Sequence, residues 1–239
     1  MTKILWLIRK IKALYIKFKL NIIFEPFSNV LLLFAYMSKM SKFLNKIEKS
    51  NFNDHLALKY DYDKRYNLYE YIIESEQIDE ICYLEFGVSQ GHSLKWWLQH
   101  IKNTRSKFYG FDTFTGLPEQ WGFFEKGAMS ADASFLQIND DRCTLVKGLF
   151  QDTLHQFLST FNNDSRRIIH LDADMYSSTL YVLTSIARFL KKDDILIFDE
   201  FTVPLHEFKA FFDFTSSYYI NFEMVGAVNN YFQIAFKIK

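Results

Sequence analysis

Beyond residue 80, short apolar segments alternate with stretches whose apolar positions recur every three or four residues. The first pattern is typical of buried strands and the second of amphipathic helices. Strands are expected at 81–86, 107–111, 142–147, 167–171, 195–198, 220–224 and 231–237, and helices at 92–102, 150–161, 179–189 and 204–218. This alternation predicts an α/β fold with a mostly parallel sheet of seven strands. The last two strands, joined through Gly226, Asn229 and Asn230, are expected to form an antiparallel pair.

The front of the chain follows a different pattern. Apolar residues recur at helical spacing over residues 4–24, interrupted by Lys and Arg, and a second apolar run covers residues 30–36. Pro26 lies between the two runs and is expected to break the helix. No uncharged apolar run reaches the roughly 20 residues that cross a bilayer, so the sequence predicts no transmembrane anchor.

Charge divides the chain at the same place. The 239 residues carry no net formal charge, yet residues 1–50 hold ten Lys or Arg against two acidic residues, a net of +8, which leaves −8 on the remainder. All eight glycines lie at or after Gly87. We therefore expect a basic helical extension at residues 1–50 and one α/β domain at 51–239. The hydrophobic content of the whole chain, 49%, is ample for a core.

Two roles remain open for the basic extension. Its Lys-rich helix suits the surface of an anionic membrane, whereas its phenylalanines favour packing on the domain and on a partner subunit, as in a homo-oligomer. The acidic domain and the lack of a nucleic-acid motif argue against nucleic acid. Cys82 and Cys143 match no disulfide or metal spacing. We expect reduced thiols in a cytoplasmic protein, peripheral to the membrane if the extension binds lipid.

Acidic residues gather where the predicted parallel strands end. They are Glu85, Asp112, Asp172, Asp174, Asp199 and Glu200. In an open α/β sheet these strand ends share one edge, where ligands bind. Six carboxylates at one edge repel one another unless a cation or a cationic ligand neutralises some of them.

A glycine-containing turn follows the first of these strands. Its spacing, Glu85-x-Gly87-x-x-x-Gly91, departs from the dinucleotide fingerprint and resembles motif I of class I S-adenosylmethionine-dependent methyltransferases. The resemblance implies a Rossmann-like fold. Ser89 and Ser93 would then meet the methionine carboxylate at a helix start, and Asp112 the ribose hydroxyls. The competing interpretation is a purely structural turn between strand and helix.

The later acidic pairs suit a metal ion. Asp172 and Asp174 follow one strand, and Asp199 and Glu200 follow the next. Carboxylate oxygens are the donors that Mg²⁺ and similar divalent ions prefer. A lone Asp-x-Asp is weak, because sugar-nucleotide transferases also use it and acids at strand ends often only cap loops.

Four segments together resemble the macrocin O-methyltransferase family, namely 110–118, 147–154, 171–179 and 198–201. The resemblance implies metal-assisted O-methylation of sugar hydroxyls by S-adenosylmethionine. It implies that Asp172, Asp199 and Glu200 hold the metal and that Asp174 is the general base. Glu200 stands where an Asp is more usual in that family.

These observations lead to one main hypothesis and two alternatives. We expect methyl transfer from S-adenosylmethionine to a hydroxyl of a small-molecule or glycan acceptor. Residues 121–141 show no strand pattern and are expected to form a lid that excludes water. A metal-dependent glycosyltransferase would explain the Asp-x-Asp but not the glycine turn, and a non-catalytic methyltransferase-fold scaffold would leave the carboxylates without a role.

Overall fold

A computed structural model of the chain describes residues 2–48, 50–120, 124–131, 136 and 138–239. Its helices are α1 (Thr2–Lys17), α2 (Asn21–Phe24), α3 (Ser28–Lys46), α4 (Lys64–Ser75), α5 (His92–His100), α6 (Phe150–Thr160), α7 (Tyr176–Ile186) and α8 (Glu207–Tyr218), with 3-10 turns η1 (Glu25–Phe27) and η3 (Ala187–Phe189). Its strands are β1 (Ile81–Phe86), β2 (Lys107–Asp112), β3 (Cys143–Lys147), β4 (Arg166–Leu171), β5 (Ile195–Phe198), β6 (Phe222–Val228) and β7 (Gln233–Ile238).

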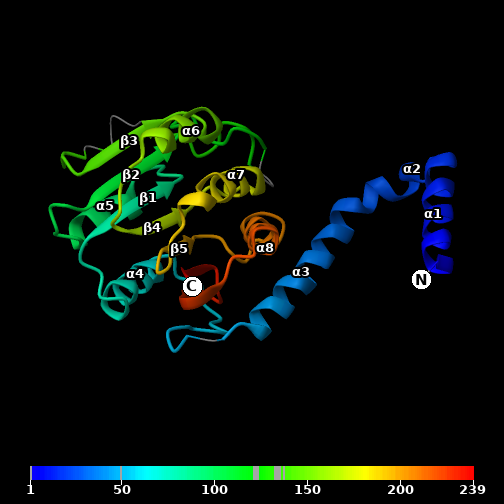
Figure 1. Cartoon of the computed structure of the whole chain (residues 1–239), viewed down its shortest axis with the longest axis horizontal. Coiled ribbons are helices and arrows are strands. Elements are labelled where there is room, and N and C mark those ends of the chain that lie inside the picture. The colour runs from blue at the N-terminus through cyan, green and yellow to red at the C-terminus, as the bar shows by residue number, and fades with distance from the viewer. Residues whose placement is uncertain (1, 49, 121–123, 132–135, 137) are drawn as a thin grey trace.

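The seven strands form one sheet in the order β3-β2-β1-β4-β5-β7-β6 (Figure 1). The first five strands in this order are parallel, and β7 runs antiparallel to both β5 and β6. This arrangement confirms the predicted α/β class and the antiparallel ending. Because the order reverses between β1 and β4, the carboxyl ends of these two strands flank the switch point where open α/β sheets bind ligands.

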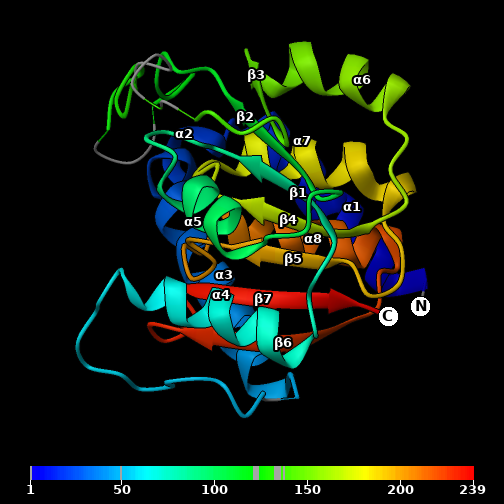
Figure 2. The same ribbon diagram turned by 90° about the vertical axis from the view of Figure 1, so that its left-hand side faces the viewer.

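Helices cover both faces of the sheet (Figure 2). α4 and α5 pack on one face, around Tyr83 and Trp97, and α6, α7 and α8 pack on the other, around Leu84 and Phe198. Alternate residues of a strand point to opposite faces, so β1, covered on both, is buried along its whole length. The buried strands therefore fix where their carboxyl ends, and the acids that follow them, come to lie.

Two local predictions were wrong, and one helix was missed. Gly226 does not join the last strands but lies inside β6, where the register shifts between Met224 and Gly226, and a side chain there would meet Leu68 and Phe52. α8 begins at Glu207 rather than at Pro204. α4 was not predicted, because its apolar residues lie among many polar ones.

The helical extension does not end at Pro26. Pro26 takes an early position in η1, where its missing N–H costs no hydrogen bond, so α2, η1 and α3 continue without a break. The resulting helical run, Asn21–Lys46, is long and apolar enough to cross a membrane by length and composition alone. Only its last part meets the sheet domain, where Tyr36 is buried and Phe43 packs against Phe201, Phe208 and Phe211.

Candidate active site

A cavity of about 300 Å³ opens at the carboxyl ends of the parallel strands. Several residues singled out in the sequence line it: Gly87, Ser89, Asp112, Asp172, Asp174 and Glu200. Glu85, Gly91, Ser93 and Asp199 do not belong to this described lining. The volume falls at the lower end of the range for small-molecule pockets.

Glycine at position 87 lets the ends of β1 and β4 come together. Its φ is +97°, and a Cβ there would lie 1.8 Å from the backbone oxygen of Asp172. No other residue could occupy this position without moving one of the strands. The glycine turn therefore sets the distance between the predicted cofactor loop and the predicted metal ligands.

Asp112 organises the loop after β1. One of its carboxylate oxygens accepts the backbone N–H of Ser89 at 2.8 Å, and the other accepts that of Phe114 at 2.6 Å. Ser89 has a positive φ of 46°, and Gly91 begins α5 in the left-handed conformation. These contacts hold the predicted cofactor loop in a fixed shape, with Ser89 and Asp112 facing the cavity.

The remaining cofactor predictions lie deeper. Glu85 is buried on the α4–α5 face of the sheet, where Tyr83 donates a 2.7 Å hydrogen bond to it and His170 is its neighbour on β4. Burial raises the pKa of Glu85 to about 8. Ser93 is buried as well, at 3.3 Å from the Tyr69 hydroxyl. Both side chains are thus buried in the domain and lie outside the described lining of the cavity.

Four predicted carboxylates come close together. Burial, and then the charge of Asp199, raise the pKa of Asp174 to about 7. Burial, and then Asp174 and Asp199, raise the pKa of Glu200 to about 8. The pKa of Asp172 rises through burial and the charges of Asp199 and Asp174. Each of these groups disfavours ionisation of the others, as the sequence predicted for acids at one edge.

The sequence interpretation missed a fifth acid, Glu207. It is fully buried at the start of α8 and accepts the backbone N–H of Glu200 at 2.9 Å. Burial raises its pKa well above normal, and Glu200 and Asp199 add to the shift. Glu207 lies three, four and seven residues before the buried Ala210, Phe211 and Phe214, so helical periodicity would have placed it on the buried face.

Tyr62 and Arg65 were missed because they precede the first strand. The Tyr62 hydroxyl donates a 2.7 Å hydrogen bond to Asp199, and the Arg65 guanidinium lies 3.8 Å from the centre of the Tyr62 ring. Tyr62 reaches this place because Asp61 exchanges two hydrogen bonds with Asn229, in the turn between β6 and β7. Such a contact over 168 positions leaves no local signal in the sequence.

The donors present fit a divalent cation. Among the described residues, the buried oxygens Glu200 Oε2 and Glu207 Oε1 have no hydrogen-bond partner. His170, Asp172 and Asp199 also place one ligand atom each within 4.8 Å of one another. Buried carboxylates without partners are costly, and a hard cation would satisfy them. The sequence predicted Asp172 and Asp199 in this role but treated His170 as a core residue.

The predicted lid is described in part. Residues 121–123, 132–135 and 137 lie outside the described residues. The described part is tied to Leu117, just before the predicted lid, because the Leu117 N–H donates to Ala128 at 2.9 Å and the Gly127 N–H donates to Leu117 at 2.8 Å. Leu117 and Met129 line the cavity. This segment therefore forms one wall of the site.

Comparison with known proteins agrees with this geometry. Residues 84–201, just under half of the chain, match the family described as a methyltransferase domain. No curated protein matches the sequence. The matched stretch runs from β1 to just past β5 and so includes every residue that we predicted for the site.

Solved structures of methyltransferases share the fold. The calicheamicin methyltransferase CalS11 has a TM-score of 0.57 at 20% identity, covering 74% of this chain and 78% of its own. The O-methyltransferase NovP has a TM-score of 0.57 at 14% identity, covering 87% and 98%. An O-methyltransferase from Bacillus cereus, solved with SAH, has a TM-score of 0.51 at 14% identity, covering 77% and 84%.

The family match and the fold together define the class of protein. The sheet is the Rossmann-like sheet of class I methyltransferases, and the chain is an S-adenosylmethionine-dependent methyltransferase. Residues 84–201 match the methyltransferase-domain family. A glycosyltransferase, the alternative that Asp172 and Asp174 left open, has no support from these comparisons.

Proposed function

We propose that this methyltransferase acts on a hydroxyl oxygen of a small, sugar-containing acceptor and that it requires a divalent cation, Mg²⁺ in the first instance. The four segments that resemble the macrocin O-methyltransferase family support this acceptor class. Two proteins of similar fold, NovP and the B. cereus enzyme, are O-methyltransferases by name.

One observation carries the proposal. Asp172, Asp174 and Glu200 line the same cavity as Gly87 and Ser89 of the cofactor loop. A donor site for S-adenosylmethionine and a cluster of hard oxygen donors thus share one space, as a metal-assisted transfer to an oxygen requires.

The carboxylates divide into two roles. Asp172, Asp199 and Glu200 would hold the cation, which when bound lowers the pKa of the acceptor hydroxyl. Asp174 would accept the proton of that hydroxyl. Its pKa of about 7 lets it be ionised near neutral pH while still binding a proton, which is the property of an efficient general base.

The rest of the cavity would position the reactants. Ser89 and Asp112 would face the cofactor, and the wall formed by Leu117 and Met129 would face the acceptor. Leu117, Met129 and Leu149 give this wall an apolar surface, which excludes water from the reacting oxygen. Tyr62, bound to Asp199, would orient that carboxylate toward the cation.

The test is a transfer assay with labelled S-adenosylmethionine, a panel of sugar nucleotides and glycans, and either Mg²⁺ or EDTA. We expect label on a sugar oxygen with Mg²⁺ and none with EDTA. Label on a nitrogen or carbon atom, or turnover that EDTA leaves unchanged, would refute the proposal. Calorimetry with S-adenosylhomocysteine, run in parallel, shows that the protein used is competent to bind its cofactor.

A further inference from the structure

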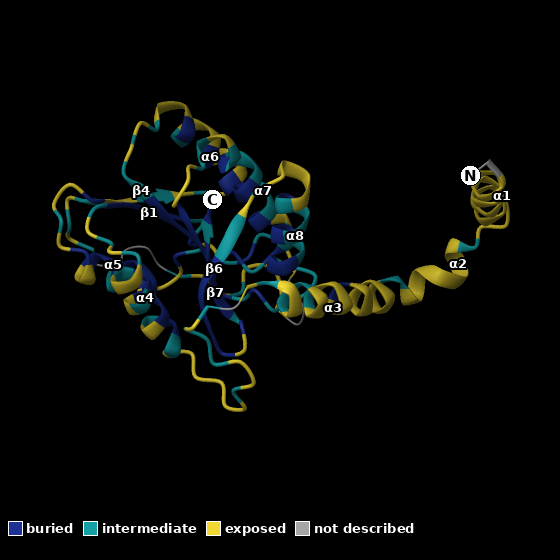
Figure 3. Cartoon of the chain, turned by 60° about the horizontal axis from the view of Figure 1, so that its bottom comes forward, coloured by how far each residue is buried: buried dark blue, intermediate teal, exposed yellow. Residues whose placement is uncertain are grey.

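The front of the chain exposes an apolar surface that the fold leaves uncovered. Every described residue from 3 to 35 is exposed except the half-buried Leu20 and Ser28. Of the large hydrophobic residues exposed in the described chain, 20 lie between Ile4 and Met37 and nine lie beyond. Figure 3 shows α1, α2 and most of α3 as exposed helix projecting from the domain.

The apolar surface surrounds the helix instead of forming one stripe. Residues 30–34 are all exposed, from 36% at Leu33 to 62% at Phe34. Five successive helical residues point in directions that cover the whole circumference. A protein partner covers a stripe, whereas a helix that is apolar all round suits hydrocarbon.

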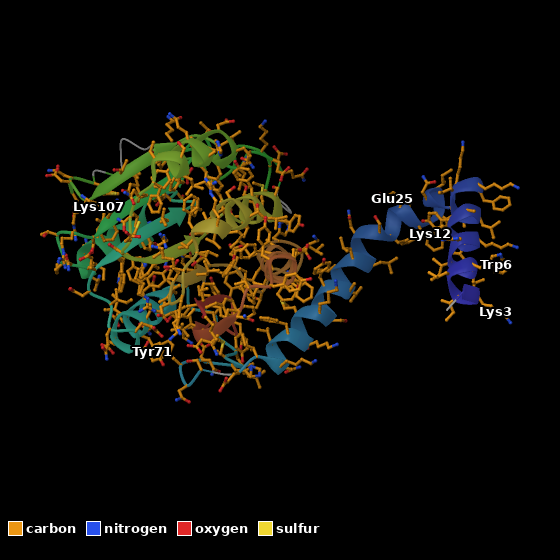
Figure 4. All side chains as sticks on the ribbon, in the orientation of Figure 1. Lys3, Trp6, Lys12, Glu25, Tyr71 and Lys107 are labelled. Atoms are coloured by element: carbon orange, nitrogen blue, oxygen red, sulfur yellow. The ribbon has the colours of Figure 1, made fainter. Side chains whose placement is uncertain are left out.

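Charge identifies the surface that would accept this helix. Six basic residues, and no acidic one, lie in the described chain before Glu25. They are Lys3, Arg9, Lys10, Lys12, Lys17 and Lys19. Figure 4 shows Lys3, Trp6 and Lys12 projecting from α1 into open space. An excess of cationic side chains beside apolar ones is typical of helices that lie on anionic lipid.

A second copy of the chain fits less well. Beyond residue 37 the described chain exposes nine large hydrophobics, four of them within residues 56–62 and five spread over residues 124–219. The described part of the domain thus offers much less apolar surface than the front of the chain does. Two copies of α1 packed together would bring their lysines close to one another. We therefore favour lipid over the homo-oligomer for this surface.

The geometry also argues against a membrane span. From Tyr36 onward α3 is docked on the domain, where the Tyr36 hydroxyl donates to Asp213 at 3.4 Å. The free part, residues 20–35, is about 24 Å long at about 1.5 Å per residue and contains Glu25. The hydrocarbon of a bilayer is about 30 Å thick. The free helix is too short to cross it before the domain begins.

We propose that residues 3–35 form an in-plane anchor that binds this methyltransferase to anionic phospholipid bilayers. The basic side chains of α1 would contact the headgroups, and residues 30–34 would enter the acyl region. The anchor works whether or not the acceptor is a sugar. It would hold the enzyme at a membrane surface, where acceptors carried on lipids are concentrated.

The first test is co-sedimentation of the full-length protein with phosphatidylcholine vesicles, with and without phosphatidylglycerol. We expect strong binding only to the anionic vesicles. Each Lys near such a surface raises binding by roughly fivefold, so R9Q/K10Q/K12Q is expected to bind about 100-fold more weakly. The matched control K59Q/K102Q/K192Q removes three exposed lysines from the domain and is expected to bind like the wild type. Equal losses in both triple variants would overturn the proposal.

The second test separates lipid from a second copy. L31S/L32S is expected to weaken vesicle binding by at least tenfold, because two apolar side chains no longer enter the acyl region. L56S/L58S, which changes exposed leucines of the domain, is expected to have no effect. The proposal is wrong if the protein binds neither kind of vesicle and light scattering shows dimers that the L31S/L32S substitutions dissociate. A second copy would then cover the helix.

The third test concerns depth. Tryptophan at position 30, in W6F/V30W, is expected to be quenched most by lipids brominated near the headgroup end of the chain. Position 30 would lie near the bilayer centre if the helix crossed the membrane. Maximal quenching by lipids brominated near the chain ends would therefore overturn the in-plane arrangement.

Discussion

Asp174 is the residue on which the chemistry depends most directly. It lines the cavity beside Asp172 and Glu200, and its φ of +57° is unusual for an aspartate. Non-glycine residues in this conformation are strained, and such strain concentrates at functional sites. Asp174 combines this conformation with a place in the lining of the cavity.

Asp174→Asn is expected to lower kcat by about 10²–10⁴-fold, because the amide cannot accept the proton of the acceptor. Binding of S-adenosylhomocysteine, measured by calorimetry, is expected to change little. Asp193→Asn, at an exposed turn with a similar φ of +70°, is the control and is expected to leave both quantities unchanged. Equal loss of binding and turnover in Asp174→Asn would argue for a structural role instead.

Gly87 gives a prediction about stability. Gly87→Ala is expected to lower the free energy of unfolding by about 2–4 kcal/mol, because its Cβ would meet the backbone of Asp172. Gly127 has a similar φ of +87°, but its Cβ would lie 4.0 Å from Thr115. Gly127→Ala is therefore expected to cost only about 1 kcal/mol, the price of a left-handed alanine. Urea unfolding of both variants measures the difference, and equal losses would rule out the clash.

The residues that the sequence could identify share one property. Asp112 ends β2, and Asp172 and Asp199 directly follow β4 and β5. The apolar runs of these strands are evident, so the parallel sheet brings the three acids to one edge. To identify Glu207 from the sequence, one must know which face of α8 is buried. Tyr62 could not be identified from the sequence, because it reaches Asp199 only when the neighbouring Asp61 contacts the turn at Asn229 in the folded protein.

Among the elements, α3 joins two environments. Its first half is exposed on every side, and its second half enters the core of the domain through Tyr36, Met40, Phe43 and Leu44. The sequence placed a boundary near residue 50 because composition and charge change there. Packing against the domain begins earlier than residue 50, because Phe43 of α3 contacts phenylalanines of α8 and β7. No local sequence pattern predicts this contact.

Phe43→Ala tests whether α3 is part of the domain. The Phe43 ring lies within 6.3 Å of five other phenylalanine rings, on residues 201, 208, 211, 222 and 236. Its removal is expected to lower the free energy of unfolding by about 3 kcal/mol. Phe34→Ala, in the exposed half of the same helix, is expected to change it by less than about 0.5 kcal/mol. Urea titration followed by circular dichroism measures both, and similar values would mean that α3 is not docked in solution.

Positive and negative charges lie in different parts of the molecule. The proposed anchor, residues 3–35, is basic, and the domain concentrates acids at the carboxyl ends of the strands. Membrane binding, oligomerisation and cytoplasmic location remain predictions. The two charged regions have different consequences: exposed lysines act on a surface that salt can screen, whereas buried acids change how the fold responds to pH and to cations.

The buried acids predict how stability depends on pH. Glu85 and Glu200 have pKa values raised to about 8 by burial, and Asp174 one raised to about 7. The folded protein therefore keeps protons that the unfolded chain has lost by about pH 5. Their contribution to stability is full at low pH and is lost as pH rises through 7 to 8. Burial lowers the pKa of His170 to about 3. The unfolded chain therefore binds a proton at this histidine below about pH 6.5 that the folded protein does not bind, so His170 makes stability rise with pH, but only below about pH 6.5.

Between about pH 6.5 and 8 the carboxylates alone decide the slope, so the Tm of the protein in EDTA is expected to fall by several degrees across this window. Mg²⁺ binds the ionised carboxylates, so it is expected to raise Tm more at pH 8 than at pH 6.5. Thermal unfolding at both pH values, with EDTA or Mg²⁺, measures the two effects. Glu200→Gln is expected to flatten the slope and reduce the Mg²⁺ effect, whereas Glu119→Gln, at an exposed position outside the buried acidic cluster, is expected to do neither. A Tm that rises with pH in EDTA would contradict the buried acidic cluster.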